Sequence, residues 1–172
     1  MPGPAIFADA NFLLYVLDDR DPAKQARAAA WHERLWREDL GRTSTQVVSE
    51  LYVNLKRMAG PRMSQEDAWM HASRYLAWEP LAIDRDVIRF AREVERRYRI
   101  SWWDSLIVVA AQLQDCAILL TEDLQDGMVF DGVTVRSPFT LGVEETGANY
   151  EARPGLASLH RPRGRPRRAA MG

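Results

Sequence analysis

The chain has 172 residues and 47% apolar content, which is enough for one ordinary domain with a substantial core. No run approaches the roughly 18 apolar residues of a membrane span, and no basic segment precedes a long apolar stretch at the N-terminus. The single cysteine, Cys116, excludes an intramolecular disulfide and lies in an apolar run, so we expect its side chain to be buried. These features predict a soluble, cytoplasmic domain.

The net charge of -1 conceals an uneven distribution of charge along the chain. Residues 1–150 hold 17 basic and 23 acidic residues, whereas residues 151–172 hold six arginines and one acid. Because the last segment is rich in proline and glycine, we predict a folded domain at 1–145 and a disordered basic tail at 146–172. The tail is either a weak RNA contact or a solvated, dispensable segment. Its arginines in that role are Arg161, Arg163, Arg165, Arg167 and Arg168.

In the first part of the chain, short apolar runs alternate with helical patterns. Proline begins the second helix, and glycines follow the second and third. The pattern predicts a strand at 5–8, a helix at 11–17, a helix at 22–39 ended by Gly41, a strand at 42–45, and a helix at 46–60 capped by Thr45.

The second part continues the alternation. It predicts a helix at 65–78 capped by Ser64, a strand at 79–83, a helix at 85–98 capped by Asp84, a helix at 101–115, a strand at 116–121, a loop at 121–127 and a strand at 132–138. Nearly every position from Leu106 to Ala111 is apolar, so we expect that helix to be buried on all sides. Alternating strands and helices predict an α/β fold, with a mostly parallel sheet covered on both faces.

Four carboxylates are expected to meet at one edge of this sheet. Asp9 and Asp123 each follow a strand, and the carboxyl ends of parallel strands share an edge. Asp104 lies at the start of a helix, and helix N-termini in right-handed βαβ units return to that edge. Glu50 lies about one turn into its helix, at the margin of the apolar face. The topology therefore brings the four acids together.

Clustered carboxylates repel one another and are costly to desolvate unless a cation neutralises them. No lysine or arginine is adjacent in sequence to any of the four, and oxygen ligands without cysteine or histidine favour Mg²⁺ or Mn²⁺. Hydrated Mg²⁺ points to phosphodiester chemistry. Each acid also has an ordinary explanation: Asp104 as a helix-start residue, Asp123 as a turn residue and Glu50 as a solvated helix position.

Four segments in order resemble the motifs of PIN-domain nucleases, and most of all the VapC-type toxins of bacterial toxin–antitoxin pairs. They are FADANFLLYVL, STQVVSELY, WWDSLIVVAAQL and ILLTEDLQDG, and the resemblance runs from about Ala5 to Leu141. It implies a PIN-like three-layer sandwich with about five strands in a mostly parallel sheet. It further implies a Mg²⁺- or Mn²⁺-dependent endoribonuclease, the toxin of a type II system, which cuts RNA, forms homodimers and is inhibited by a small antitoxin protein.

The resemblance also implies roles for individual residues. Asp9 and Asp104 would bind the metal with help from Asp123, and Glu50 would hold or activate water. The remaining positions are Asn11 and Thr121, which would orient the carboxylates, and Glu122 and Asp126, which either substitute in the fourth acidic position or belong to a solvated loop.

Three other interpretations stay open. The chain could be a housekeeping PIN nuclease of RNA processing, or an inactive PIN domain that binds nucleic acid through its arginine-rich tail. A phosphohydrolase with Asp9 as nucleophile is disfavoured, because Asn11 stands where such enzymes usually have a second aspartate. Trp102 and Trp103 either contact bases or a partner, or pack in the core.

Overall fold

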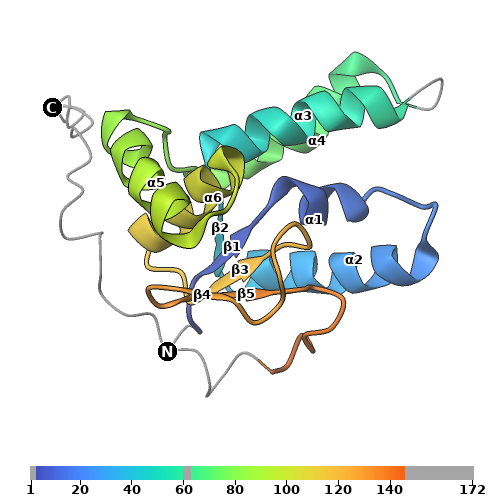
Figure 1. Ribbon diagram of the computed structural model, residues 1–172. Helices are drawn as coiled ribbons and strands as arrows, with labels where there is room; N and C mark the ends of the chain where they lie inside the picture. Colours follow the sequence, from blue (N-terminus) through green and yellow to red (C-terminus); the bar gives the residue numbers. More distant parts are fainter. Residues whose placement is uncertain (1–2, 60–62, 146–172) are drawn as a thin grey trace, which may run out of the picture.

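A five-stranded sheet forms the centre of the protein in the computed structural model, which describes residues 3–59 and 63–145 (Figure 1). The strand order is β2-β1-β3-β5-β4, and every neighbouring pair is parallel except β4 and β5. The strands are β1 (Ile6–Ala8), β2 (Gly41–Arg42), β3 (Ile118–Leu120), β4 (Val129–Phe130) and β5 (Val133–Arg136). The predicted α/β class with a mostly parallel sheet is confirmed.

Helices flank the sheet on both sides (Figure 1). They are α1 (Ala10–Tyr15), α2 (Pro22–Arg37), α3 (Thr45–Ala59), α4 (Gln65–Ser73), the 3₁₀ helix η2 (Arg74–Trp78), α5 (Arg85–Tyr98) and α6 (Trp102–Leu113). Figure 1 shows α3 and α4 as an antiparallel pair that extends away from the sheet, and α5 on the outside of the molecule beside α6. No helix within residues 3–59 and 63–145 is long and apolar enough to cross a membrane.

The core lies around β1, β3 and α6. All residues of β1 and β3 are buried, as is every residue of α6 from Ser105 to Leu113. The expectation of a buried helix is therefore confirmed from Ser105 onward, and Cys116 is buried as predicted. Gln112, the polar exception near the end of α6, donates its amide to the carbonyl of Phe130 at 3.0 Å.

One predicted strand is wrong and one observed strand was not predicted. Residues 79–83 form only an isolated parallel bridge between Leu81 and Ser44. The fifth strand is instead β4, which pairs antiparallel with β5 through Asp131 and Gly132. Both turn residues have positive φ, at 46° and 100°, as a two-residue type I′ hairpin requires. The Asp-Gly pair was the sequence signal for this hairpin.

Two predicted helix boundaries are also wrong. α2 ends at Arg37, and Asp39 rather than Gly41 adopts the left-handed conformation after it, with φ 54°. Gly41 lies in β2, where a Cβ atom would come within 2.5 Å of the Trp78 ring. Thr45 is already the first residue of α3, and Ser44 accepts the hydrogen bond from the Val47 amide at 3.4 Å.

The caps predicted for the following helices are confirmed. Ser64 accepts from the Asp67 amide at the start of α4, and Asp84 accepts from the amides of Asp86 and Val87 at the start of α5. The segment 146–172, predicted as a basic tail, lies outside the described residues together with the five arginines assigned there to a weak RNA contact.

Candidate active site

Asp9 and Thr121 are joined by the register of two neighbouring strands. β1 and β3 pair with Ala8 opposite Leu120, so the next residues on the two strands stand side by side. Thr121 donates its hydroxyl to Asp9 Oδ2 at 2.8 Å, and the Ala10 amide donates to Asp9 Oδ1 at 2.7 Å. Asp9 is only 5% exposed, so both carboxylate oxygens are held inside the protein.

Asp123 joins the same network from the loop after β3. Its backbone amide donates to Thr121 Oγ1 at 3.1 Å, so a single hydroxyl links the backbone of Asp123 to the carboxylate of Asp9. Asn11, in α1, donates its side-chain amide to the Asp123 carboxylate. The other end of that amide, Asn11 Oδ1, is buried without a hydrogen-bond partner among the described residues.

Glu50 and Asp104 reach the site from two helices. Glu50 lies in the second turn of α3 and accepts from Gln46 Nε2 at 2.9 Å, one helical turn earlier. Asp104 lies in the first turn of α6, where its amide donates to the N-cap Ser101 and its Oδ2 accepts from the Ser101 hydroxyl at 2.6 Å. The helix-start role foreseen for Asp104 is therefore present, and it occupies one carboxylate oxygen.

The electrostatics show that the four carboxylates share one neighbourhood. Burial, together with the charges of Asp123 and Glu50, raises the pKa of Asp9 to about 7, against the opposing hydrogen bonds from Thr121 and Ala10. Burial and the charges of Asp104 and Glu122 also raise the pKa of Asp123, which the Asn11 hydrogen bond opposes. The charges of Glu50 and Asp123 therefore act on Asp9, and the charge of Asp104 acts on Asp123.

Glu122 and Asp126 are held by other partners. Glu122 forms an ion pair with Lys24 Nζ at 3.1 Å. Asp126 pairs with Arg136 at 3.0 Å and accepts from the Ser137 amide at 2.9 Å, which ties the loop to the end of β5. Asp126 therefore ties down the loop after β3, whereas Glu122 pairs with Lys24 and still lies close enough to raise the pKa of Asp123.

Lys24 is the residue near the site that sequence reasoning missed. It comes from α2, 98 positions before Glu122, and its Nζ also lies 4.9 and 4.8 Å from the ring centres of Tyr15 and Phe139. Nothing in the sequence connects these positions, because the contact depends on α2 packing beside the loop that follows β3.

A divalent cation fits the chemistry of these groups. Within residues 3–59 and 63–145, no three acidic, histidine or cysteine side chains are already arranged to hold one ion. Mg²⁺, however, binds through one or two carboxylates and keeps several waters. The donors are all oxygens, Asn11 Oδ1 has no partner, and the raised pKa of Asp9 is the penalty that a nearby cation would relieve. We conclude that the residues present fit a hydrated divalent cation.

The two tryptophans before Asp104 differ in their surroundings. Trp102 is half-buried and packs against the core, whereas Trp103 is 63% exposed. The packing interpretation thus holds for Trp102, and Trp103 is available on the surface beside an acid of the cluster.

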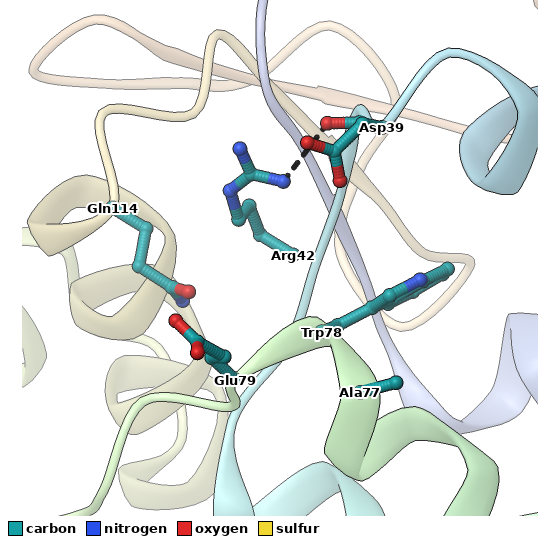
Figure 2. A pocket seen from close by; sticks show the side chains of 6 residues that line it. All are labelled: Asp39, Arg42, Ala77, Trp78, Glu79 and Gln114. Carbon is teal, nitrogen blue, oxygen red and sulfur yellow. Dashed lines mark hydrogen bonds between the residues drawn. The ribbon is translucent and has the colours of Figure 1, made fainter. Parts of the chain in front are cut away.

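A pocket of about 490 Å³ lies away from the acids, at the amino ends of β2 and β3 (Figure 2). Asp39 precedes β2 and Gln114 precedes β3, which places them at the opposite edge of the sheet from Asp9. Figure 2 shows Arg42 in the middle of the pocket, where its guanidinium donates to the Asp39 carbonyl at 3.1 Å. None of the four acids lines this pocket.

Comparison with known proteins supports the same family as the motifs. The model of the PIN domain family matches residues 6–125. A search among curated proteins found none that matches the chain. Among solved structures, VapC20 of Mycobacterium tuberculosis, described as a sarcin–ricin loop cleaving toxin, is similar with a TM-score of 0.52 and 20% identity, over 67% of this chain and 87% of that one. With the family model covering well over half of its length, the chain belongs to the PIN domain family.

Proposed function

We propose that this protein is a Mg²⁺-dependent endoribonuclease of the VapC type, the toxin of a type II toxin–antitoxin pair. The observation that carries the proposal is the state of Asp9: a buried carboxylate with a raised pKa, held at the end of β1 near Glu50 and Asp123. Such a group lowers the stability of the folded protein, and carboxylates with perturbed pKa values cluster at functional sites. The similarity to VapC20, which is described as a sarcin–ricin loop cleaving toxin, supports the proposal of a nuclease toxin.

The roles are those that the resemblance to PIN-domain nucleases implies, and the contacts of Thr121, Asn11 and Glu50 are consistent with them. Asp9 and Asp104 would hold the ion, with Asp123 assisting, and a bound ion would supply neutralisation of phosphate charge and a lowered pKa of water. Thr121 and Asn11 fix the orientations of Asp9 and Asp123 through the hydrogen bonds described above. Glu50, itself oriented by Gln46, positions the attacking water and accepts its proton. The bond from phosphorus to the ribose oxygen breaks opposite the attacking water, and the leaving oxygen takes a proton from solvent.

The same proposal names partners. An RNA strand is the substrate, and a small antitoxin protein would inhibit the enzyme by covering the acidic edge. A homodimer in the cytoplasm is the expected working form. A housekeeping PIN nuclease would use the same acids, so the identity of the neighbouring gene, not the site, separates these two roles.

A cleavage assay with matched variants tests the proposal. Asp9→Asn and Asp104→Asn should each lower the rate of cleavage of a labelled RNA by at least about 100-fold, and EDTA should abolish it, because each change removes a ligand of the ion. The control pair Asp39→Asn and Glu79→Gln makes the same chemical change in the pocket at the other edge of the sheet. It should leave the rate unchanged. Cleavage at the wild-type rate by Asp9→Asn would contradict the proposal.

A further inference from the structure

The outer face of α5 carries a line of arginines, which we call the α5 stripe: Arg85, Arg89, Arg92 and Arg96, followed by Arg99. The spacing of four, three and four residues places the first four on one side of the helix. All five side chains are exposed. At 1.5 Å per residue, the stripe from Arg85 to Arg96 extends over roughly 16 Å.

The stripe faces solvent because the opposite face of α5 is committed to the core. Val87, Ala91 and Val94 are buried there, about half a turn of the helix away from the arginines. Helix propensity would be satisfied by lysine, glutamate or glutamine on the outer face as well. The helix therefore does not need arginine at the positions of the α5 stripe in order to fold, and the positive charge is a property of the surface.

Much of this positive charge is not neutralised by the protein. Arg92 pairs with Glu95 and Arg96 with Glu93, both as exposed ion pairs that contribute little. Arg85, Arg89 and Arg99 form no ion pair with any side chain in the ranges 3–59 and 63–145. Residues 85–99 hold six arginines and three acids, in a region (residues 1–150) that holds 17 basic and 23 acidic residues. The segment is thus a positive surface on an otherwise acidic domain.

The end of the stripe leads to the acidic site. Arg99 precedes Ser101 by two residues, and Ser101 is the N-cap of α6 that hydrogen-bonds Asp104. Trp103, the neighbour of Asp104, is among the most exposed large apolar side chains of the described residues. Cations that track phosphates, followed by an aromatic ring on which a base can stack, are the usual features of surfaces for single-stranded nucleic acid.

We propose that the α5 stripe and Trp103 form the docking surface for a single-stranded segment of RNA next to the scissile phosphodiester. The arginines contact the backbone phosphates, and Trp103 stacks on a base beside Asp104. The surface answers a physical need, because an acidic domain repels a polyanion unless one path to the site is positive. The inference rests on the proposed ribonuclease function and adds to it the route of the substrate.

The salt dependence of RNA binding tests the arginines. We expect Arg85→Ala/Arg89→Ala to weaken the binding of a labelled single-stranded RNA by the full-length protein in EDTA, where no cleavage occurs. The slope of log K against log salt concentration should become shallower by about 1.4, that is about 0.7 for each lost phosphate contact. The control Arg37→Ala/Arg57→Ala removes the same charge from exposed positions on α2 and α3 and should keep the wild-type slope.

Trp103→Ala separates stacking from charge. The variant should bind the RNA about tenfold more weakly with an unchanged salt slope, because stacking on an aromatic ring releases no counterions. An unchanged affinity would remove Trp103 from the docking surface and contradict the proposal as stated.

The outcomes also separate this inference from the proposed function. If the wild-type protein cuts RNA and the stripe variant keeps its affinity and its salt slope, the docking surface is wrong and the nuclease stands. If the slope changes as expected but the wild-type protein cuts no RNA in Mg²⁺, the surface stands and the nuclease is wrong. If the stripe variant alters only self-association, measured by sedimentation, the stripe is a protein interface and the inference is overturned.

Discussion

Acidic residues lie at both ends of the parallel strands. Asp9 lies where the strands end, which we call the carboxyl edge, and Asp39 and Glu79 lie where they begin, which we call the amino edge. The residues at the two edges are in different states. At the carboxyl edge, Asp9 is buried, both its oxygens accept hydrogen bonds, and its pKa is raised to about 7. At the amino edge, Asp39 and Glu79 are exposed residues that line an open pocket, and both have a left-handed backbone, with φ of 54° and 50°. Strain is therefore electrostatic at one edge and conformational at the other.

This difference between the two edges separates acids that indicate a functional site from acids that do not. An aspartate or glutamate at a helix end is common and its cost is local, about 1–2 kcal/mol for a left-handed backbone. A buried carboxylate near two others has a larger cost that no local change relieves, and it persists where a ligand compensates for it. Acidic composition alone does not distinguish the two edges, whereas burial and the shared network do.

The largest expected effect is the pH dependence of stability in the metal-free protein. Because the folded state holds the Asp9 proton up to a pKa of about 7, the unfolded chain loses its proton first as the pH rises from about 4. The folded state is then the one that binds more protons, so the free energy of unfolding falls between about pH 4 and pH 7 and levels off above it. The difference between a pKa of about 4 in the unfolded chain and about 7 in the folded protein corresponds to on the order of 4 kcal/mol. Urea unfolding in EDTA from pH 4.5 to 8.5 measures this fall.

Asp9→Asn should remove this fall and make the metal-free protein more stable than the wild type at pH 8. The amide keeps an oxygen for the Ala10 amide and presents a donor to Thr121, whose hydroxyl can rotate to accept. Adding Mg²⁺ should stabilise the wild type at pH 8 and not the variant. The control variant Asp39→Asn/Glu79→Gln should keep the wild-type dependence of stability on pH. An equal change of that dependence in Asp9→Asn and in the control would contradict the proposed difference between the edges.

The next effect concerns Thr121, which supports the carboxyl edge. Thr121→Val removes the hydrogen bonds to Asp9 Oδ2 and from the Asp123 amide, so the free energy of unfolding should fall by about 1–3 kcal/mol. The Mg²⁺ concentration for half-maximal cleavage should rise about tenfold, because the carboxylates lose their orientation. Thr134→Val in β5 makes the same chemical change and should alter neither quantity. Reduced stability without a change in the Mg²⁺ requirement would make Thr121 a purely structural residue.

The sequence was sufficient to predict the acidic edge because the cause is topological. Asp9 and Asp123 follow buried strands, and any parallel pairing of those strands brings the two carboxylates to the same edge. Thr121 was placed with them only through the resemblance to PIN-domain nucleases, and its position after β3 matches that of Asp9 after β1. The roles assigned to these residues remain predictions that the variants above test.

The features that sequence reasoning missed depend on tertiary contacts or on short elements. β4 has two residues with one exposed, so no periodic pattern marks it, although the Asp-Gly turn does. The strand expected at 79–83 is reduced to one bridge between Leu81 and Ser44, since the neighbouring strand β2 has only two residues. Lys24 reaches Glu122 across 98 positions, a contact that only the packing of α2 creates.

The smallest expected effect lies at the amino edge and concerns Glu79, the residue after η2. Its left-handed backbone costs about 1–2 kcal/mol for a side chain with Cβ, and glycine adopts the same conformation without that cost. Because glycine also increases the entropy of the unfolded chain, Glu79→Gly should raise the free energy of unfolding by only up to about 1 kcal/mol. Glu79→Ala removes the same carboxylate but keeps the strained backbone, so it should give no gain.

Both Glu79 variants should cut RNA at the wild-type rate, as measured in the same cleavage assay. The contrast with Asp9 is then complete: relief of strain at the amino edge stabilises the protein without loss of activity, whereas relief at the carboxyl edge stabilises it and abolishes cleavage. A stabilised Asp9→Asn protein that still cuts RNA, or a Glu79→Gly protein that no longer does, would reverse the assignment of function to the two edges. Under the proposed function, strain at Asp9 persists because the reaction needs the carboxylate there, whereas strain at Glu79 persists because its cost is small enough for a folded domain to tolerate.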